Sequence, residues 1–476
     1  MPSPPESESL LQTVAGRFTA WAERWIPDAF VFALVATIIV VALAMSMTDT
    51  GPPDVVRIWG RGLWGLLSFT MQMALVVITG YVVATAPKVH SLIAALAKAP
   101  RSPRSAVAMV ALFAMATSWL NWGFSLMFSA MLAKETARRI PGVDYRALAA
   151  ASFLGLGSVW AQGLSGSAAL QMATPTALPQ GIRTIVEHGG VIEGGVIPLT
   201  STIFLWQSLV SVAVELVLLT VLMYFVAPTA ARAKSAQALG IDLGPSPSEG
   251  SAEPPTKPKT PVEWLEHTPV LNLVIGALAV TYIVSHFASA SSALHAISLD
   301  VINLSFLTLG VLLHWTPARL MRAVREATPA VWGIILQFPF YAGMAAIISE
   351  TKLNELVARW FVSISTRETF PAVIAGYSAV LGVFVPSGGG KWVIEAPYVM
   401  AAAHDHQVHL GWMVAVYDLG EALANLVQPF WMLPILAVFA LKARDIMGYT
   451  FLVFLVLTPV VLVLVTILGA TLRYPL

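Results

Sequence analysis

The stretch VFVPSGGGKWVIEAPYV at residues 383 to 399 decides how the chain is expected to fold. It lies in a long apolar region, yet it carries three consecutive glycines, a lysine and a glutamate. Unpaired backbone groups in hydrocarbon cost several kcal/mol each, so a helix that breaks there must line a cavity or be buried in protein. Glycines permit the break and leave N–H groups exposed at the start of the returning helix, where anions bind readily.

The composition predicts a polytopic membrane protein. Hydrophobic residues make up 57% of the 476 residues and charged residues only 11%, whereas a soluble protein carries about a quarter charged residues. The net charge of +1 argues against a nucleic-acid partner. The absence of cysteine excludes disulfides, thiolate metal sites and thiol nucleophiles. The histidines have no metal-ligand spacing, so we expect neither a metal nor a cofactor.

Apolar runs predict about nine full transmembrane helices, because roughly 20 helical residues cross ~30 Å of hydrocarbon. These runs lie at 29–47, 62–87, 147–174, 196–227, 268–289, 298–315, 328–349, 411–440 and 446–471. Two further runs are interrupted near their centres. The first, 105–133, breaks at Asn121 to Gly123, and the second, 370–403, breaks at Pro386 to Lys391.

Flanking charges predict that each interrupted run enters the membrane and returns on the same side. Basic residues flank the first run at both ends: Lys98, Arg101 and Arg104 before it, and Lys134, Arg138, Arg139 and Arg146 after it. The positive-inside rule therefore places both ends in the cytoplasm. The alternative is one long tilted helix, with its two basic clusters on opposite sides. The second run exits at HDHQVH, residues 404–409, without lysine or arginine, and opens to the other side.

The order of these segments predicts an inverted repeat. Trp64 precedes Asn121 by 57 residues, and Trp332 precedes Ser387 by 55. We divide the chain into a cytoplasmic N-terminal segment 1–27, a first repeat 28–227, a cytoplasmic linker 228–267, an extra helix and loop 268–297, and a second repeat 298–476. The re-entrant hairpins span 105–134 and 370–403. The N-terminal segment lacks a signal-peptide pattern and is expected to stay in the mature protein.

Each half also contains a broken helix, and four interrupted segments meeting at mid-depth are typical of a secondary transporter. The broken helices are WAQGLSGSAALQMATPTALP at 160–179 and YDLGEALANLVQPFWMLP at 417–434. Small residues there can instead serve only close helix packing. The candidate substrate-binding residues are Asn121, Gly123, Ser165, Ser167, Ser387, Gly388, Gly389, Gly390, Lys391 and Asn425.

Charged residues inside the predicted spans are the candidates for substrate and ion chemistry. Lys391 either binds an anion directly or pairs with Glu395, four residues further along one helical face. Asp418 and Glu421, three residues apart, are candidate ligands of a coupling Na⁺ or carriers of a coupling proton. Alternatively, one of them caps a broken helix end or pairs with Lys391.

Aromatic residues lie within a few positions of every break: Trp119, Trp122, Phe124, Trp160, Phe384 and Trp392. They either form the walls of the site or serve ordinary packing and lipid contact. One cation, a few hydroxyl and amide groups and apolar walls suit a small carboxylate with an apolar tail. A dicarboxylate requires more positive or polar contacts.

Three motifs carry a resemblance to a known family: SWLNWGFSLMFSAMLAKE at 118–135, GLSGSAALQMATP at 163–175 and VPSGGGKWVIEAPYV at 385–399. Over nearly its whole length the chain resembles the bacterial short-chain fatty acid transporter family of the ion transporter superfamily. The resemblance implies two re-entrant hairpins, elevator-like movement, a homodimer in the inner membrane, and transport of acids such as butyrate and acetoacetate.

The sequence departs from the Ser-Asn-Thr hairpin motifs of sodium-coupled dicarboxylate relatives. It has Leu-Asn-Trp-Gly at 120–123 and Pro-Ser-Gly-Gly-Gly-Lys at 386–391, so Asn121 and Ser387 match by hairpin position only. Proton symport and sodium symport therefore both stay open. The alternatives in function are a C4-dicarboxylate or basic amino acid carrier or exchanger, a channel, and a membrane-embedded acyl-transfer enzyme using His404 or Asp405.

Overall fold

The computed structural model describes residues 29–187, 190–229, 233–243, 260–290, 294, 296–384 and 387–476. Three sequence predictions fall wholly or partly outside these residues: the N-terminal segment 1–27, residues 244–259 of the linker, and Pro386 at the second break. All regular elements of the described residues are helices, so the predicted all-α fold class is confirmed.

The first half of the chain forms long helices separated by short turns. They are α2 (Ala29–Met47), α3 (Pro52–Gly62), α4 (Leu67–Ala84), α5 (Pro87–Leu96), α6 (Pro103–Leu120), α7 (Trp122–Arg139), α8 (Tyr145–Phe153), η1 (Val159–Gln162), α9 (Ser167–Ala173), α10 (Gln180–Glu187), η3 (Glu193–Gly195), η4 (Leu199–Ser201) and α11 (Trp206–Val226). Prolines at the first helical position start α3, α5 and α6, where the missing N–H costs nothing.

The second half of the chain is also helical. It contains η5 (Gln237–Leu239), α13 (Pro261–His267), α14 (Val270–Ser289), α15 (Leu299–His314), α16 (Pro317–Ala327), η6 (Thr328–Ala330), α17 (Trp332–Glu350), α18 (Leu353–Ile364), α19 (Phe370–Phe384), α20 (Gly388–Asp405), α21 (Leu410–Asn425), η7 (Phe430–Met432), α22 (Leu433–Phe439) and α23 (Ala443–Gly469). In both halves a short, a long and a short helix come before the interrupted run: α3, α4 and α5 before α6–α7, and α16, α17 and α18 before α19–α20.

Six helices in the described part of the chain are long and apolar enough to cross a membrane: α4, α6, α11, α14, α17 and α23. Shorter apolar helices lie at Ala33–Met47, Leu299–His314 and Phe370–Val383. The predicted run 196–227 begins as a helix only at Trp206, because turns around Pro198 precede it. The runs 147–174 and 411–440 are each divided into separate helices.

The first interrupted run folds into a helical hairpin. In one straight helix, residues 114 and 125 would lie about 16 Å apart. Instead, the Ser125 hydroxyl of α7 donates to the Ala114 carbonyl of α6 over 2.7 Å. The long tilted helix is therefore wrong. The break is confined to Asn121, which has an extended backbone (φ −160°), and Gly123 lies inside α7.

The second interrupted run forms a similar hairpin from α19 and α20. Lys391 Nζ of α20 donates to the Ser378 carbonyl of α19 over 2.7 Å, although 13 residues separate them in the chain. The glycine run was expected to form the break, and this expectation is wrong. Gly388 to Gly390 form the first turn of α20, because Ser387 caps the helix with its hydroxyl, which accepts from Gly390 N–H over 3.2 Å.

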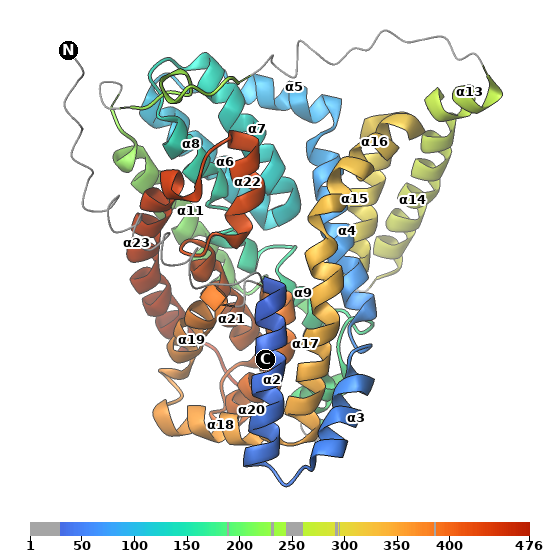
Figure 1. Cartoon of the computed structure of the whole chain (residues 1–476), viewed down its shortest axis with the longest axis vertical. Coiled ribbons are helices and arrows are strands. Elements are labelled where there is room, and N and C mark those ends of the chain that lie inside the picture. Colours follow the sequence, from blue (N-terminus) through green and yellow to red (C-terminus); the bar gives the residue numbers. More distant parts are fainter. Residues whose placement is uncertain are drawn as a thin grey trace.

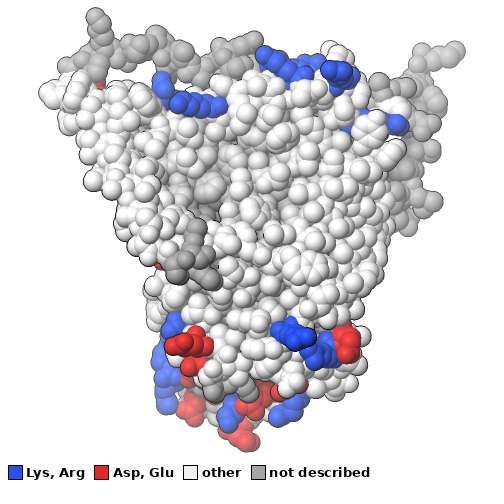
Figure 2. Space-filling view, turned by 180° about the vertical axis from the view of Figure 1, so that it is seen from behind, with Lys and Arg blue, Asp and Glu red and all other residues white. Residues whose placement is uncertain are grey.

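The two hairpins occupy opposite ends of the molecule: Figure 1 shows α6–α7 in the upper part and α19–α20 in the lower part. Charged side chains also gather at the two ends, and a broad surface without charge separates them (Figure 2). Exposed apolar side chains such as Val217, Phe225 and Leu278 belong to helices of this intermediate zone. Such a belt matches the hydrocarbon of a bilayer.

Candidate functional site

Both hairpin tips and both broken segments meet around one small cavity of about 30 Å³. This cavity, named here the tip cavity, has room for one or two water molecules and not for a four-carbon acid. Helices α4 and α17 complete its walls. Its lining residues are Met73, Trp122, Leu156, Trp160, Ser167, Ile334, Phe338, Ser387, Gly388, Gly389, Asn425 and Trp431.

The glycines of the second tip are required by close packing. A Cβ on Gly388 would lie 2.7 Å from Trp160 Cη2, and one on Gly390 would lie 2.3 Å from Tyr341 Cδ2. A Cβ on Gly389 would meet the Phe69 ring at 2.9 Å. None of the three has a positive φ angle, so the turn does not depend on backbone conformations that favour glycine. Missing side chains allow the tip to reach the tip cavity.

The first tip is held by neutral hydrogen bonds. Asn121 Oδ1 accepts from Phe124 N–H over 2.8 Å and caps α7. Trp122 N–H donates to the Ser165 hydroxyl over 2.9 Å, which ties this tip to the broken segment of its own half. Gly123 lies against the backbone of α4, since an added Cβ would be 3.1 Å from Val76 O. Asn121, Gly123 and Ser165 thus position the tip and do not line the tip cavity.

The two broken segments are linked across the halves. Asp418 Oδ2 accepts from Ala168 N–H at the start of α9 over 2.9 Å, as one of the alternatives for this carboxyl predicted. Asn425 Nδ2 donates to Leu156 O over 3.0 Å, and Gln428 Nε2 donates to Asn425 Oδ1 over 2.9 Å. Residues far apart in sequence are thereby fixed within one polar core.

Lys391 pairs with Glu421 and not with Glu395, so the pairing expected four residues along the helix is wrong. Its Nζ lies 2.7 Å from Glu421 Oε2 and donates to Ser378 O at 2.7 Å and Ser378 Oγ at 3.0 Å. The Ser378 hydroxyl donates onward to Tyr417 O over 2.8 Å. The ammonium group is thus held by two hydrogen bonds to Ser378 and an ion pair with Glu421, and Lys391 does not line the tip cavity.

Three buried carboxyl groups surround Lys391. Asp418, Glu421 and Glu395 are fully buried, and Asp418 Oδ1 has no hydrogen-bond partner among the described residues. These three carboxyls face a single cation, Lys391. The part of the chain that is described contains no cluster of three or more Asp, Glu, His or Cys side chains placed to hold a metal ion.

Two of the predicted aromatic walls line the tip cavity, namely Trp122 and Trp160. The others pack elsewhere: Trp119 on Phe204, Phe124 on Phe128 and Trp392 on Tyr417. The side chain of Phe384 lies outside the described part of the structure.

Sequence reasoning missed the wall residues Met73, Ile334 and Phe338, which are ordinary apolar residues of continuous helices and carry no local signal. It also missed Ser378, whose role depends on the fold of the hairpin.

A second buried group of polar side chains surrounds Glu215 on α11. Its Oε1 accepts from Gln162 Nε2 over 3.0 Å and from the Ser211 hydroxyl over 3.1 Å. Gln162 directly precedes the break at Gly163. Gln162 and Glu215 are 53 residues apart in the chain, so their contact depends on the packing of η1 against α11 and could not be predicted from the sequence.

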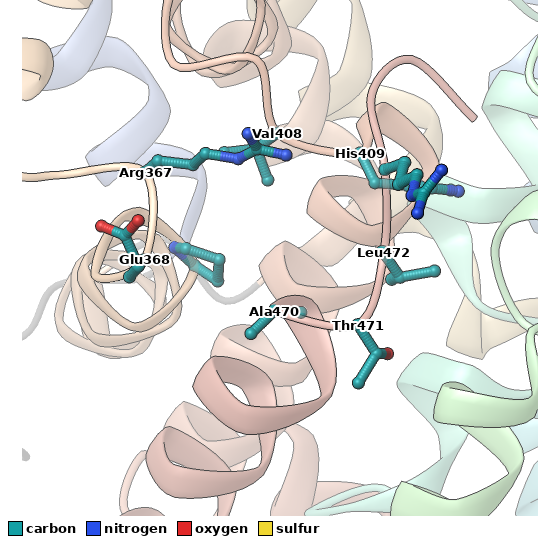
Figure 3. A pocket seen from close by; sticks show the side chains of 10 residues that line it. Arg367, Glu368, Val408, His409, Ala470, Thr471 and Leu472 are labelled. Carbon is teal, nitrogen blue, oxygen red and sulfur yellow. The ribbon is translucent and has the colours of Figure 1, made fainter.

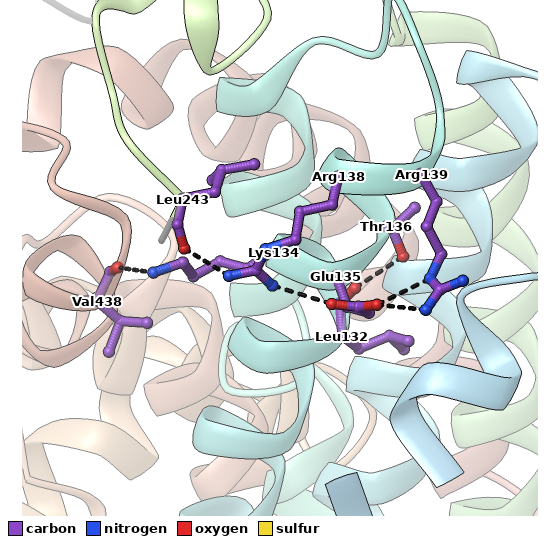
Figure 4. Close-up of polar contacts among 8 residues, drawn as sticks. All are labelled: Leu132, Lys134, Glu135, Thr136, Arg138, Arg139, Leu243 and Val438. Carbon is purple, nitrogen blue, oxygen red and sulfur yellow. Dashed lines mark hydrogen bonds and ion pairs between the residues drawn. The ribbon is translucent and has the colours of Figure 1, made fainter. Parts of the chain in front are cut away.

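The openings of the two hairpins differ in their surroundings. At the first opening, Glu135 pairs with Arg138 (2.9 Å) and Arg139 (2.6 Å), and Lys134 Nζ donates to Val438 O over 3.3 Å (Figure 4). Arg138 also donates to the Leu243 carbonyl. These contacts fasten the end of α7 to α22 and to Leu243 within the predicted linker.

The second opening adjoins a cavity of about 450 Å³, named here the outer cavity (Figure 3). Arg367, Glu368 and His409 lie at its rim together with Thr471 and Arg473 from the end of the chain. Burial lowers the pKa of His409 to about 4, so this ring is neutral near pH 7.

Solved structures share this architecture at low sequence identity. The YdaH transporter of Alcanivorax borkumensis aligns over 93% of this chain and 98% of its own, with a TM-score of 0.58 and 15% identity. MtrF of Neisseria gonorrhoeae, described in its structure's title among a class of antimetabolite efflux pumps, aligns over 98% of both chains, with a TM-score of 0.59 and 13% identity. The fold is therefore one that membrane transporters use.

Sequence comparison identifies the family. The family model described as "Short chain fatty acid transporter" matches residues 10–468. A protein of Escherichia coli (strain K12) named "Putative short-chain fatty acid transporter" is 35% identical, covering 90% of this chain and 94% of its own. A protein of the same name from Haemophilus influenzae is 34% identical, covering 92% and 96%. The chain belongs to the short-chain fatty acid transporter family; it is a multi-pass membrane transporter and not an enzyme.

Proposed function

We propose that the protein is a secondary active carrier that moves short-chain fatty acids or small keto acids, such as butyrate and acetoacetate, across the bacterial inner membrane. The observation that carries this proposal is the convergence of two helical hairpin tips, inserted from opposite ends, on one small cavity. A carrier needs a central site that opens to one side at a time, and hairpin tips at such a site provide the gates.

In the membrane, the two halves form an inverted repeat and the hairpins are re-entrant. The repeated order of helices and the position of the hairpins at opposite ends support this assignment. The basic residues at the opening of the first hairpin support a cytoplasmic location for that end. Labelling of cysteines introduced at Arg104 and Lys134 from one side of a vesicle tests this topology, and reaction from opposite sides rejects it.

The substrate carboxylate binds at the second tip. Gly388 and Gly389 belong to the first turn of α20, whose N–H groups have no acceptor within the helix, and the hydroxyl of Ser387 lies beside them. The cavity must widen to admit a four-carbon acid, whose apolar alkyl chain then lies against Trp122, Trp160 and Phe338. Since Lys391 lies outside the lining of the tip cavity and is paired with Glu421, this site suits one carboxylate better than two, which favours a monocarboxylate over a C4-dicarboxylate.

Transport is driven by a proton or sodium gradient, with the ion taken up at Asp418 and Glu421. Both carboxyls lie directly behind the second tip: a Cβ on Gly388 would be 3.2 Å from Asp418 Oδ1. The hydrogen bonds from Ala168 to Asp418 and from Asn425 to Leu156 join the broken segments into one body. This body moves in an elevator-like step within a homodimer. The mass of the protein in detergent, measured by light scattering, tests the dimer.

Purified protein in liposomes tests the function. Labelled butyrate or acetoacetate is expected to accumulate inside when a proton or sodium gradient is imposed, and the required ion identifies the coupling. Ser387→Ala is expected to reduce uptake, whereas Gly376→Ala, at a position of α19 with open space around it, is a matched control. Flux that never exceeds equilibrium indicates a channel. No uptake of any short acid rejects the proposal, and strong competition by C4-dicarboxylates or basic amino acids points to another substrate class.

A further inference from the structure

A third cavity, larger than the tip cavity and smaller than the outer cavity, lies between α2 and the second hairpin. Its volume is about 280 Å³, and none of its lining residues is shared with the tip cavity. Apolar side chains from five helices form its walls, among them Ile39 and Leu43 of α2, Met344 of α17 and Val357 of α18. Ile39 and Leu43 are exposed in part, so this chamber is reached from the side of the molecule, at the level of the bilayer. We name it the side chamber.

Polar groups line the side chamber only where α19 and α20 form its inner end. The hydroxyls of Tyr377 and Tyr398 lie 2.9 Å apart and hydrogen-bond to each other. Lys391 also reaches this end, where its ammonium group forms hydrogen bonds to Ser378 and an ion pair with Glu421. The carboxyl of Glu395 lies beside the Tyr417 hydroxyl, yet within the described structure neither of its oxygens has a hydrogen-bond partner of normal geometry.

Even with a hydrogen bond from Tyr417, at least one carboxyl oxygen of Glu395 has no partner within the described structure. A buried carboxyl without a hydrogen bond is costly, and an ionisable residue at membrane depth marks a functional site by default. The partner must reach Glu395 through an apolar chamber. It must accordingly carry a hydrogen-bonding group at one end and an alkyl chain behind it.

We propose that the side chamber binds the undissociated form of a short- or medium-chain carboxylic acid. The acid's O–H donates to Glu395, and its alkyl chain extends outward between α2, α17 and α18. A carboxylate anion fits less well, because it adds a further carboxylate to the buried carboxyls of Glu395, Glu421 and Asp418, and Lys391 is already paired with Glu421. A phospholipid tail ends in a methyl group and leaves Glu395 without a donor. The side chamber is thus an acid site separate from the tip cavity and open to acids dissolved in the bilayer.

Photoaffinity labelling of the full-length protein in nanodiscs tests this site directly. The probe is an eight-carbon acid with a diazirine near the end of its chain, and labelled peptides are mapped by mass spectrometry. We expect label on α2, α17 or α18. Glu395→Met is expected to reduce labelling about tenfold or more, to the level of the probe's methyl ester, while Glu395→Gln, which retains donor and acceptor, preserves most of it.

A second variant keeps the test valid if Glu395 variants do not fold. Leu43→Trp fills the side chamber from α2 and is expected to abolish labelling, whereas Leu34→Trp, on the same helix but outside the lining, is the matched control. Equal labelling by acid and methyl ester overturns the proposal. So does label confined to the tip cavity, or label in the chamber from a diazirine phospholipid but not from the acid. Labelling without any transport would instead overturn only the proposed carrier function.

Discussion

The two helical hairpins have the same topology but bury very different polar groups. The first hairpin, α6–α7, turns at Asn121, and its tip is satisfied by the neutral side chains of Asn121 and Ser165. The second, α19–α20, has its cap at Ser387 and carries Lys391 and Glu395 within its core. A neutral tip can stay fixed at little cost, whereas buried charges depend on their partners and respond to a proton, an ion or a substrate.

The two hairpins also differ in how their openings are held. The opening of the first hairpin is fastened by Glu135, Arg138 and Lys134, while the second opens beside the outer cavity. Four sets of variants test this contrast.

The largest expected effect comes from Lys391→Met, which leaves Glu421 buried without its cation. Removing one partner of a buried ion pair costs about 3–5 kcal/mol, so thermal unfolding in detergent should shift strongly downward. The double variant Lys391→Met with Glu421→Gln should recover part of this loss. Lys134→Met in the first hairpin, which loses one contact to Val438 O at 3.3 Å, should change stability by no more than about 0.5 kcal/mol. Equal losses for both lysines would contradict the contrast.

Gly390→Ala is expected to destabilise the protein by about 1–3 kcal/mol, because the added Cβ lies 2.3 Å from the Tyr341 ring. Gly123→Ala at the first tip meets Val76 O at 3.1 Å and should cost less. Gly376→Ala has open space and should stabilise α19 by about 0.5–1 kcal/mol through helix propensity. Melting temperatures of the three variants give the order, and a neutral Gly390→Ala would refute the packing role of the glycine run.

The two caps should cost similar stability but differ in function. Asn121→Ala and Ser387→Ala each remove one acceptor for a helix N–H, a loss of about 1 kcal/mol. Only Ser387 lines the tip cavity, so only Ser387→Ala should raise the KM for uptake in liposomes. A raised KM in Asn121→Ala with unchanged KM in Ser387→Ala would move the substrate site to the first tip.

The smallest effect concerns His409, at the opening of the second hairpin. Its folded pKa of about 4 lies below the unfolded value of about 6.5, so the unfolded state binds more protons between these values. Stability from this group is complete above about pH 6.5 and is lost as the pH falls toward 4. His409→Gln should reduce the difference in melting temperature between pH 7.5 and pH 5 by about 2 °C. An unchanged difference would show that His409 titrates normally in the folded protein.

Much of the fold could be predicted because its signals are local. The apolar runs, the interruption at Asn121 and the basic flanks indicated the first hairpin, and Ser387 with its glycines indicated the second. The glycine run was misinterpreted as the break itself, since sequence shows that a Cβ is absent but not which neighbour requires its absence. That neighbour for Gly390 is Tyr341, on α17.

The candidate site was predicted in part for the same reason. Ser167, Ser387, Gly388, Gly389 and Asn425 do line the tip cavity. Helical spacing suggested Glu395 as a partner of Lys391, but Glu421 on a different helix takes that place. Contact along one helix is visible in sequence, whereas contact between helices depends on how they pack.

The sequence by itself determined where the backbone must leave its helix, because capping residues, prolines and long apolar runs act over a few neighbouring positions. Only the tertiary structure decided which polar groups meet: Ala168 with Asp418, Lys391 with Ser378 and Glu421, and Glu395 with an apolar chamber. The physical reason is that buried charges and hydrogen-bond donors are satisfied by whatever group packing brings within about 3 Å, and that distance is set by the assembly of all helices together.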